Sequence, residues 1–214
     1  MSLISNMKLL LVAATEAEIA PTLSHFNLVS GKFIETEKFD VLITNVGMVA
    51  TAFALGQVLS DKYSLVLNVG IAGSFDKSIS LGEVVNITQD TFAELGAEDH
   101  DSFITLPELG FGENSFSSIT KTPLTLKEVR GITVNKVHGN TQSIEKITQL
   151  YQPQTESMEG AAVFYACLQI KIPVLQVRSI SNYVEPRNRS NWQINLAVSQ
   201  LNHWLINFLN KEAA

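Results

Sequence analysis

The sequence predicts an α/β protein, a three-layer α/β/α sandwich around a mixed, mostly parallel central sheet. Continuous apolar runs at residues 8–14 and 173–177 are typical of strands buried on both faces. Segments with helical spacing of apolar residues, such as 48–60, alternate with these strands. Two short runs around a polar turn, 32–36 and 40–44, indicate a hairpin that makes the sheet mixed. Strands that alternate with helices favour helices on both faces of one sheet.

The remaining elements follow from the same patterns along the chain. The expected strands are residues 8–14, 32–36, 40–44, 65–69, 82–91, 132–137 and 173–177. The expected helices are residues 16–26, 48–60, 144–151, 160–169 and 191–210. Residues 70–74 are expected to form a glycine-bearing turn, and residues 94–118 a long polar loop. Residues 1–6 are expected to be a ragged start ahead of the first strand.

The length of 214 residues suits one large core, and no linker divides the chain, so we expect a single domain over 1–214. Only 17% of the residues are charged, against about 25% in an average soluble chain, which favours a buried subunit interface and a homodimer or higher homo-oligomer. The net charge of −6 argues against nucleic acid and anionic membranes and favours a small-molecule ligand. No apolar run reaches the roughly 18 residues of a membrane span, and the start lacks signal-peptide features, so a cytoplasmic location is expected.

Glu159 is a charged residue between apolar segments. One interpretation is a structural carboxylate paired with a basic side chain. The other is an acceptor for two sugar hydroxyls, a role that needs an ionised carboxylate at a strand-to-helix junction. The residues alone leave both interpretations open.

Glu18 also has two interpretations. Thr15 and Glu18 have the spacing of a capping box, which satisfies backbone donors at a helix start. However, Pro21 fits poorly inside a helix that begins at Glu16, so the helix would begin nearer Pro21 and leave Glu18 in a loop. In that loop, at the end of the first strand, Glu18 would serve as a general base.

Other polar residues near the expected strand ends can be explained by ordinary structural roles. Arg178 and Asn182 follow the strand 173–177, where open α/β sheets place ligands, but an ion pair and a turn cap are common roles for them. Asp99-His100-Asp101 has no second ligand pair at metal-binding spacing, so no metal site is expected. Cys167 is expected to be a small buried hydrophobe.

Five blocks of sequence, in order, resemble the purine nucleoside phosphorylase and nucleosidase superfamily. Within it, they are most similar to the methylthioadenosine/S-adenosylhomocysteine nucleosidase branch that includes the futalosine hydrolases. The blocks are residues 8–18, Asn45-Val-Gly-Met-Val-Ala50, Asn68-Val-Gly-Ile-Ala-Gly73, Ser157-Met-Glu-Gly-Ala161 and Val177-Arg-Ser-Ile-Ser-Asn182. A single glycine turn is weak evidence, but five blocks in the same order are strong evidence.

The resemblance implies a role for each matching residue. Glu18 would orient and deprotonate the attacking water, and Glu159 would accept the ribose hydroxyls. Asn182 would be the third catalytic residue and would contact the purine base. The implied substrate contacts are Met158 against the sugar, Arg178 near the carboxylates, Gly70 and Ile71 in the glycine segment, and His138 and Gln142 in the base wall. No cofactor and no metal are implied.

Asn182 stands where adenine-specific members of the family have an aspartate. An aspartate can accept from the 6-amino group of adenine, whereas an asparagine can donate to the O6 carbonyl of hypoxanthine. A buried mismatch costs about 1–3 kcal/mol. Asn182 therefore points to hypoxanthine, and the resemblance implies hydrolysis of the N-glycosidic bond of futalosine to hypoxanthine and dehypoxanthine futalosine, in the alternative menaquinone route.

Three alternatives remain at this point. The first is an adenine-releasing nucleosidase for methylthioadenosine, S-adenosylhomocysteine or aminofutalosine. The second is phosphorolysis, for which Arg187 and Arg189 are candidate phosphate contacts. The third is a purine-binding protein without turnover, against which both glutamates argue. The chain also departs from the family pattern in having Ile71 in place of a serine and Gly160 in place of an alanine.

Overall fold

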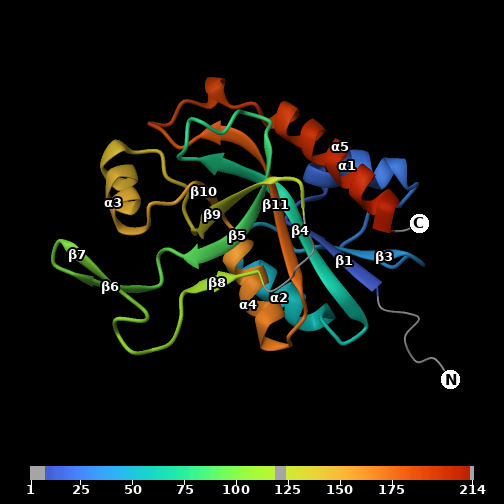
Figure 1. The fold of residues 1–214 in the computed structure, drawn as a ribbon, viewed down its shortest axis with the longest axis horizontal. Coiled ribbons are helices and arrows are strands. Elements are labelled where there is room, and N and C mark those ends of the chain that lie inside the picture. The colour runs from blue at the N-terminus through green and yellow to red at the C-terminus, as the bar shows by residue number, and fades with distance from the viewer. Residues whose placement is uncertain (1–7, 119–123, 213–214) are drawn as a thin grey trace.

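A computed structural model of the chain describes residues 8–118 and 124–212. Its described strands form a nine-stranded mixed sheet in the order β10-β9-β5-β11-β4-β1-β3-β2, with β8 on β5 (Figure 1). A separate hairpin consists of β6 and β7. The strands are β1 Lys8–Ala13, β2 Phe33–Ile34, β3 Phe39–Ile43, β4 Tyr63–Ser74, β5 Val84–Phe92, β6 Gly96–Asp99, β7 Ser102–Thr105, β8 Ser115–Ser117, β9 Lys127–Thr133, β10 Thr155–Ser157 and β11 Val174–Tyr183. The expectation for residues 1–6 lies outside the described part of the chain.

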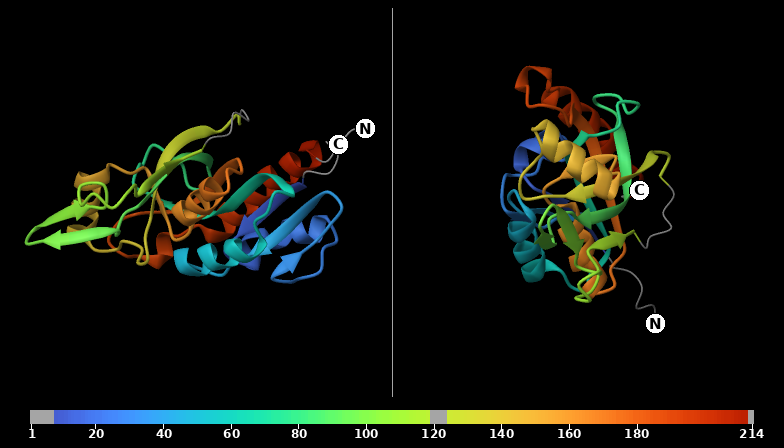
Figure 2. Two further views of the ribbon diagram at one scale, coloured as in Figure 1. Left: turned by 90° about the horizontal axis from the view of Figure 1, so that it is seen from below. Right: turned by 90° about the vertical axis from the view of Figure 1, so that its left-hand side faces the viewer.

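Helices cover both faces of the sheet, as the sequence predicts. Helices α1 (Glu16–His25) and α5 (Ile194–Glu212) pack together on one face, where α5 contacts β11 and β4. Helices α2 (Met48–Val58) and α4 (Gly160–Gln169) pack together on the other face (Figure 2). Helix α3 (Thr141–Tyr151) lies beside β9 and β10, and a short 3-10 helix spans Arg189–Asn191. No helix of the described ranges has the length and apolar character needed to cross a bilayer.

The centre of the sheet consists of β1, β4 and β11, which run parallel to one another. Their apolar side chains alternate between the two helical layers, so both faces are buried. Leu10 and Val66 belong to the core under α2 and α4, whereas Leu11, Leu67 and Val177 belong to the core under α1 and α5. This explains why the strands appear in the sequence as continuous apolar runs.

Strand β10 closes part of the sheet on itself. It pairs in parallel with β9 and antiparallel with β4, so that β4, β11, β5, β9 and β10 form a ring. In this ring, Gly73 of β4 lies between Glu156 of β10 on one side and Asn182 of β11 on the other. Two residues that are 26 positions apart in sequence, Glu156 and Asn182, therefore lie next to the same glycine of the sheet.

Several predicted boundaries are wrong because strand pairing is non-local. Residues 70–74 are not a turn, since β4 continues through them while it pairs with β11 and β10. Arg178 and Asn182 lie within β11, which extends to Tyr183, and do not follow the strand. Strand β9 spans Lys127–Thr133, whereas the sequence predicts a strand at residues 132–137. The expected loop at 94–118 contains the β6–β7 hairpin and β8.

Of the two alternatives for the start of α1, the capping box at Thr15 is confirmed and a start near Pro21 is wrong, because the helix begins at Glu16. A side chain from α5 repairs the turn that Pro21 disturbs. The Asn202 side-chain amide nitrogen donates to the Glu18 carbonyl (2.8 Å), and its oxygen accepts from the Thr22 N–H (3.0 Å). Such an insertion replaces a helical hydrogen bond and leaves Glu18 in the first turn.

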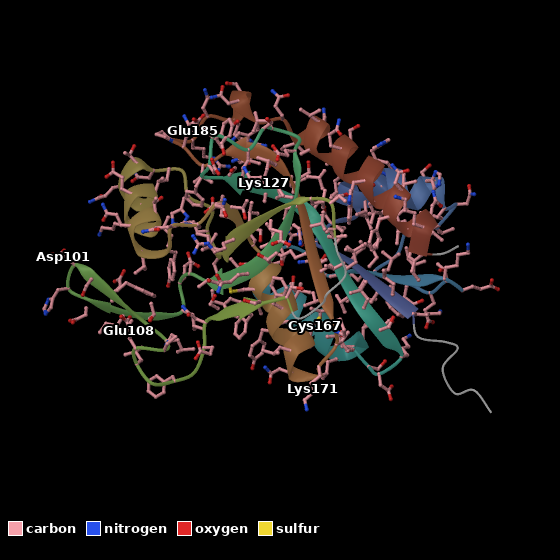
Figure 3. The ribbon with its side chains drawn as sticks, in the orientation of Figure 1. Asp101, Glu108, Lys127, Cys167, Lys171 and Glu185 are labelled. Carbon is pink, nitrogen blue, oxygen red and sulfur yellow. The ribbon has the colours of Figure 1, made fainter. Side chains whose placement is uncertain are left out.

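Cys167 has the buried position that the sequence predicts. Asp101 lies at the outer end of the β6–β7 hairpin, and Cys167 lies on α4 in the interior (Figure 3). Burial raises the pKa of the Cys167 thiol to about 12, which suits a buried hydrophobe and not a nucleophile. Within the described ranges, no group of three or more His, Cys, Asp or Glu residues is placed to hold a metal ion.

Candidate active site

A cavity of about 810 Å³ opens where β1, β4 and β11 end, at the carboxyl edge that α/β sheets use for ligands. Its wall includes six of the residues that the sequence singles out: Glu18, Ile71, His138, Met158, Glu159 and Asn182. The structure therefore brings both glutamates and the asparagine to one cavity. Gln142 is not part of this wall, because it is exposed in the first turn of α3.

Glu18 forms the capping box that the sequence predicts and also lines the cavity. Its Oε2 accepts from the N–H and the hydroxyl of Thr15, both at 2.9 Å, as a helix-capping carboxylate does. Its Oε1 accepts from the N–H of Ile71 at 3.1 Å, so the carboxylate also bridges α1 and β4. These three donors fix the orientation of a carboxylate that lines the cavity.

Glu159 immediately precedes α4 and is only 9% exposed. Burial raises the pKa of its carboxyl group, while the charge of Arg178 and the N–H of Gly47 act in the opposite direction. The Gly47 N–H donates to Oε1 at 3.0 Å, from a backbone with φ of 100° that favours glycine. Glu159 thus has one oxygen held by the protein and belongs to the cavity wall.

Arg178 lies beneath the cavity and not on its wall. It is 2% exposed, and its Nη1 is 3.5 Å from Oδ1 of Asn68. Its Nε and Nη2 have no hydrogen-bond partner among the described residues. A Cβ on Gly70 would lie 2.7 Å from Nη1 of Arg178 and 2.8 Å from Oε1 of Glu18. Gly70 is therefore the point at which this buried cation and the Glu18 carboxylate approach each other.

A series of buried, hydrogen-bonded polar side chains, which was not predicted from the sequence, continues from Arg178 under α4. The Asn68 amide nitrogen donates to Oε1 of Gln176 (3.2 Å), and Nε2 of Gln176 donates to Asp90 (2.6 Å). Asp90 also accepts from the Thr133 hydroxyl at 2.9 Å. Burial raises the pKa of Asp90 to about 6, against the lowering effect of these hydrogen bonds. Polar residues inside apolar strand runs were the available signal for this series of side chains.

Asn182 lines the cavity with a side-chain amide whose orientation is fixed. Its Nδ2 donates to the Tyr183 carbonyl at 3.1 Å, and its Oδ1 accepts from the Ser181 hydroxyl at 2.8 Å. A carbonyl can only accept, so the amide nitrogen must face Tyr183, and this fixes the orientation of the side chain. One N–H of the amide remains for a ligand.

His138 and Glu156 form a second polar group beside Asn182. The His138 Nδ1 is 2.6 Å from Oε2 of Glu156, and the His138 backbone N–H donates to Oε1 at 2.9 Å. Both residues line the cavity, together with Arg187, whose guanidinium lies 5.0 Å from the centre of the Trp192 ring. Glu156 was missed in the sequence, although a charge between Thr155 and Ser157 in a buried strand was a usable signal.

An α/β sheet with three carboxylates and an amide around one cavity defines a protein built to bind and act on a small polar molecule. The chain belongs to the phosphorylase superfamily, whose family model matches residues 5–209. A futalosine hydrolase of Thermus thermophilus is 28% identical over 205 residues, which cover 90% of this chain and 91% of that protein. A futalosine hydrolase of Streptomyces coelicolor is 32% identical over 65% of this chain and 62% of that protein.

Solved structures share the fold over almost the whole chain. The 5'-methylthioadenosine/S-adenosylhomocysteine nucleosidase of Helicobacter pylori, solved with butyl-thio-DADMe-Immucillin-A, has a TM-score of 0.80 at 18% identity. The match covers 97% of this chain and 99% of that chain. At this identity, the likeness concerns the fold, and it confirms the predicted α/β architecture.

Proposed function

We propose that this protein is an N-glycosidase that hydrolyses futalosine and releases hypoxanthine. The observation that carries the proposal is Asn182, which lines the cavity and whose fixed amide has one N–H left to donate to a ligand. This donor suits the O6 carbonyl of a 6-oxopurine and not the amino group of adenine. The named similarity to futalosine hydrolases of two organisms supports the same substrate. We also propose that this reaction belongs to the alternative menaquinone route and takes place in the cytoplasm.

The two glutamates divide the sugar chemistry. Glu18, fixed by three donors, holds the attacking water and takes its proton as the new C–O bond forms. Glu159 accepts the ribose hydroxyls with its remaining oxygen, and its charge opposes the positive charge that develops on the sugar. Met158 lies on the cavity wall next to Glu159 and contacts the sugar face. Arg178 acts on the carboxylates from below by its charge.

A release assay tests the proposal. Purified protein is incubated with futalosine or aminofutalosine, with and without inorganic phosphate, and the free base is separated by chromatography. Release of hypoxanthine without phosphate, at a higher kcat/KM than release of adenine, is the expected result. Strict dependence on phosphate would instead make the protein a phosphorylase. Faster adenine release would support the adenine-specific nucleosidase alternative.

Glu18→Gln and Glu159→Gln variants test the assignment of the two carboxylates. Each is expected to lose about 10²–10⁴-fold in kcat, the range of positioned acid–base groups. A purine-binding protein without turnover would bind hypoxanthine, and neither the wild type nor a variant would release it from a nucleoside.

We further propose that the protein is a homodimer whose interface lies on α2 and α4. A second, largely apolar groove of about 750 Å³ lies between these helices and the β6–β8 region. Large apolar side chains are exposed on or beside it: Val49 at 78%, Phe53 at 68%, Phe111 at 76% and Tyr165 at 45%. Exposed apolar area of this kind marks association surfaces. Sedimentation should show a dimer, and Phe53→Glu should shift it toward monomer.

A further inference from the structure

The pair formed by His138 and Glu156 lies beside Asn182, the residue that we propose recognises the purine base. Glu156 and Asn182 flank Gly73 on the two neighbouring strands. A Cβ on Gly73 would lie 3.2 Å from Nδ2 of Asn182 and 3.7 Å from Cγ of Glu156, so both side chains converge over this glycine. Glu156 is 4% exposed and holds His138 through both carboxylate oxygens. The imidazole is thus fixed next to the residue that recognises the purine.

The hydrogen bonds define which ring nitrogen can exchange a proton. The Glu156 carboxylate engages Nδ1 of His138, so Nδ1 carries a hydrogen in both the neutral ring and the imidazolium. No described residue provides a hydrogen-bond partner for Nε2. Nε2 is therefore the ring nitrogen that is available to a ligand in the cavity that His138 lines.

The departing base needs a proton that Asn182 cannot supply. When the bond between C1' and N9 breaks, its electron pair remains on the purine as negative charge. A side-chain amide can stabilise this charge by hydrogen bonding but has no proton to transfer near neutral pH. Where the related adenine-specific pattern has a carboxyl group, this chain therefore requires a different acid.

We propose that His138, held by Glu156, is the general acid of the reaction. This inference rests on the proposed purine nucleosidase function. The Nε2–H of the imidazolium is transferred to N7 of the purine as the glycosidic bond breaks, and His138 is left neutral with Nδ1–H still on Glu156. Glu18 takes one proton of the water, whose hydroxyl forms the bond to C1'. The products are the free base and the free sugar, so atoms and charge balance.

The surroundings of His138 determine how the test is designed. The titratable and charged groups that line the same cavity are Glu18, Glu156, Glu159, Arg187 and His203. Arg187 packs against the residue that follows His138, because its backbone N–H donates to the Gly139 carbonyl at 3.0 Å. The Phe75 ring lies 6.4 Å from the His138 ring and carries no charge. The decrease of kcat on the alkaline side should therefore depend on His138 and respond to Glu156.

The experiment compares wild type, His138→Gln and Glu156→Gln over a pH series with futalosine. His138→Gln should reduce kcat by about 10²–10⁴-fold, with a small change in KM, and should abolish the alkaline decrease. Glu156→Gln should keep an alkaline decrease but shift it to lower pH. His25→Gln is the matched control, since His25 lies on α1 against Phe26 and outside the cavity wall, and it should behave as wild type.

A second substrate separates a general acid from a structural residue. 4-Nitrophenyl β-D-ribofuranoside has a leaving group that departs without a proton, so His138→Gln should lose far less activity on it than on futalosine. An equal loss on both substrates, or a wild-type alkaline decrease in His138→Gln, overturns the inference. Failure of the wild type to release hypoxanthine would overturn the proposed function instead, and the same variants would then be compared on methylthioadenosine.

Discussion

Gly160 lies directly against the buried carboxylate of Asp90, at the start of α4. A Cβ built on Gly160 would collide with Oδ2 of Asp90 and would lie 2.6 Å from Oε1 of Gln176. Gly160, where the sequence departs from the alanine of the pattern it resembles, thus coincides with a buried carboxylate–amide pair. Glycine at this position makes room for the series of polar side chains that leads to Arg178.

Gly160→Ala is expected to destabilise the protein by about 1–3 kcal/mol, the usual cost of overpacking a core. The methyl group can be accommodated only if Asp90 or Gln176 moves and weakens its hydrogen bond. Gly56→Ala is the control, because no atom lies within 4 Å of its added Cβ and α2 would gain up to about 1 kcal/mol in helix propensity. Urea unfolding measures both, and equal stabilities of the two variants would contradict the packing argument.

Asp90 makes stability depend on pH with a defined sign. Its folded-state pKa of about 6 exceeds its ordinary value of 3.8, so the folded protein binds more protons between these values. Stability therefore decreases as pH rises through this window, by up to about 3 kcal/mol at 1.36 kcal/mol per pKa unit. Asp90→Asn cannot titrate. The difference in unfolding free energy, wild type minus Asp90→Asn, should fall between pH 4 and 6 and level off above. A constant or rising difference would exclude a raised pKa.

Local patterns predicted the layers of the fold but not the extent of its strands. Apolar runs identify β1 and the first part of β11, because burial on both faces leaves a continuous signal. The glycine segment of β4 has weak strand propensity, and only pairing with β10 and β11 keeps it extended. Such pairing cannot be deduced from neighbouring residues.

The candidate site shows the same division. Glu18, Glu159 and Asn182 were predicted together because each stands at a recognisable sequence block, and the structure places all three on one cavity wall. The contact of Glu156 with His138 was not predicted, since it depends on where β10 enters the sheet. Pro21 misled the prediction for α1, because its compensation comes from α5.

Gly70→Ala is expected to reduce activity more than stability. Its methyl group would lie within 3 Å of both Arg178 and Glu18 and would displace one of them. A displacement of about 1 Å at a catalytic group can cost about 10²-fold in rate. Steady-state kinetics should show a decrease in kcat of this order. Gly31→Ala, whose Cβ would meet its neighbours at 3.6 Å or more, should retain wild-type kinetics, and a similar loss there would point to a general effect.

Arg178 should control the acidic side of the pH profile through Glu159. Burial raises the pKa of Glu159 and the Arg178 charge lowers it, so removal of that charge raises the pKa further. Glu159 must be ionised to accept the ribose hydroxyls. As the pH is lowered, activity should therefore begin to fall at a higher pH in Arg178→Gln than in wild type. Arg178→Lys, which keeps the charge, should shift the profile less. A kcat/KM series from pH 4 to 8 measures the shift, and identical acidic limbs would exclude this coupling.

Asn182→Asp tests how the base is chosen. The aspartate replaces the N–H that faces the cavity with an acceptor, which suits the 6-amino group of adenine and repels the O6 of hypoxanthine. A mismatch of about 1–3 kcal/mol corresponds to about a 5–150-fold change in the ratio of kcat/KM for aminofutalosine to that for futalosine. Asn195→Asp adds the same charge to the cavity wall from α5 and should leave this ratio unchanged. Competition between the two nucleosides in one reaction measures the ratio directly, and an unaltered ratio in Asn182→Asp would show that another residue reads the purine edge.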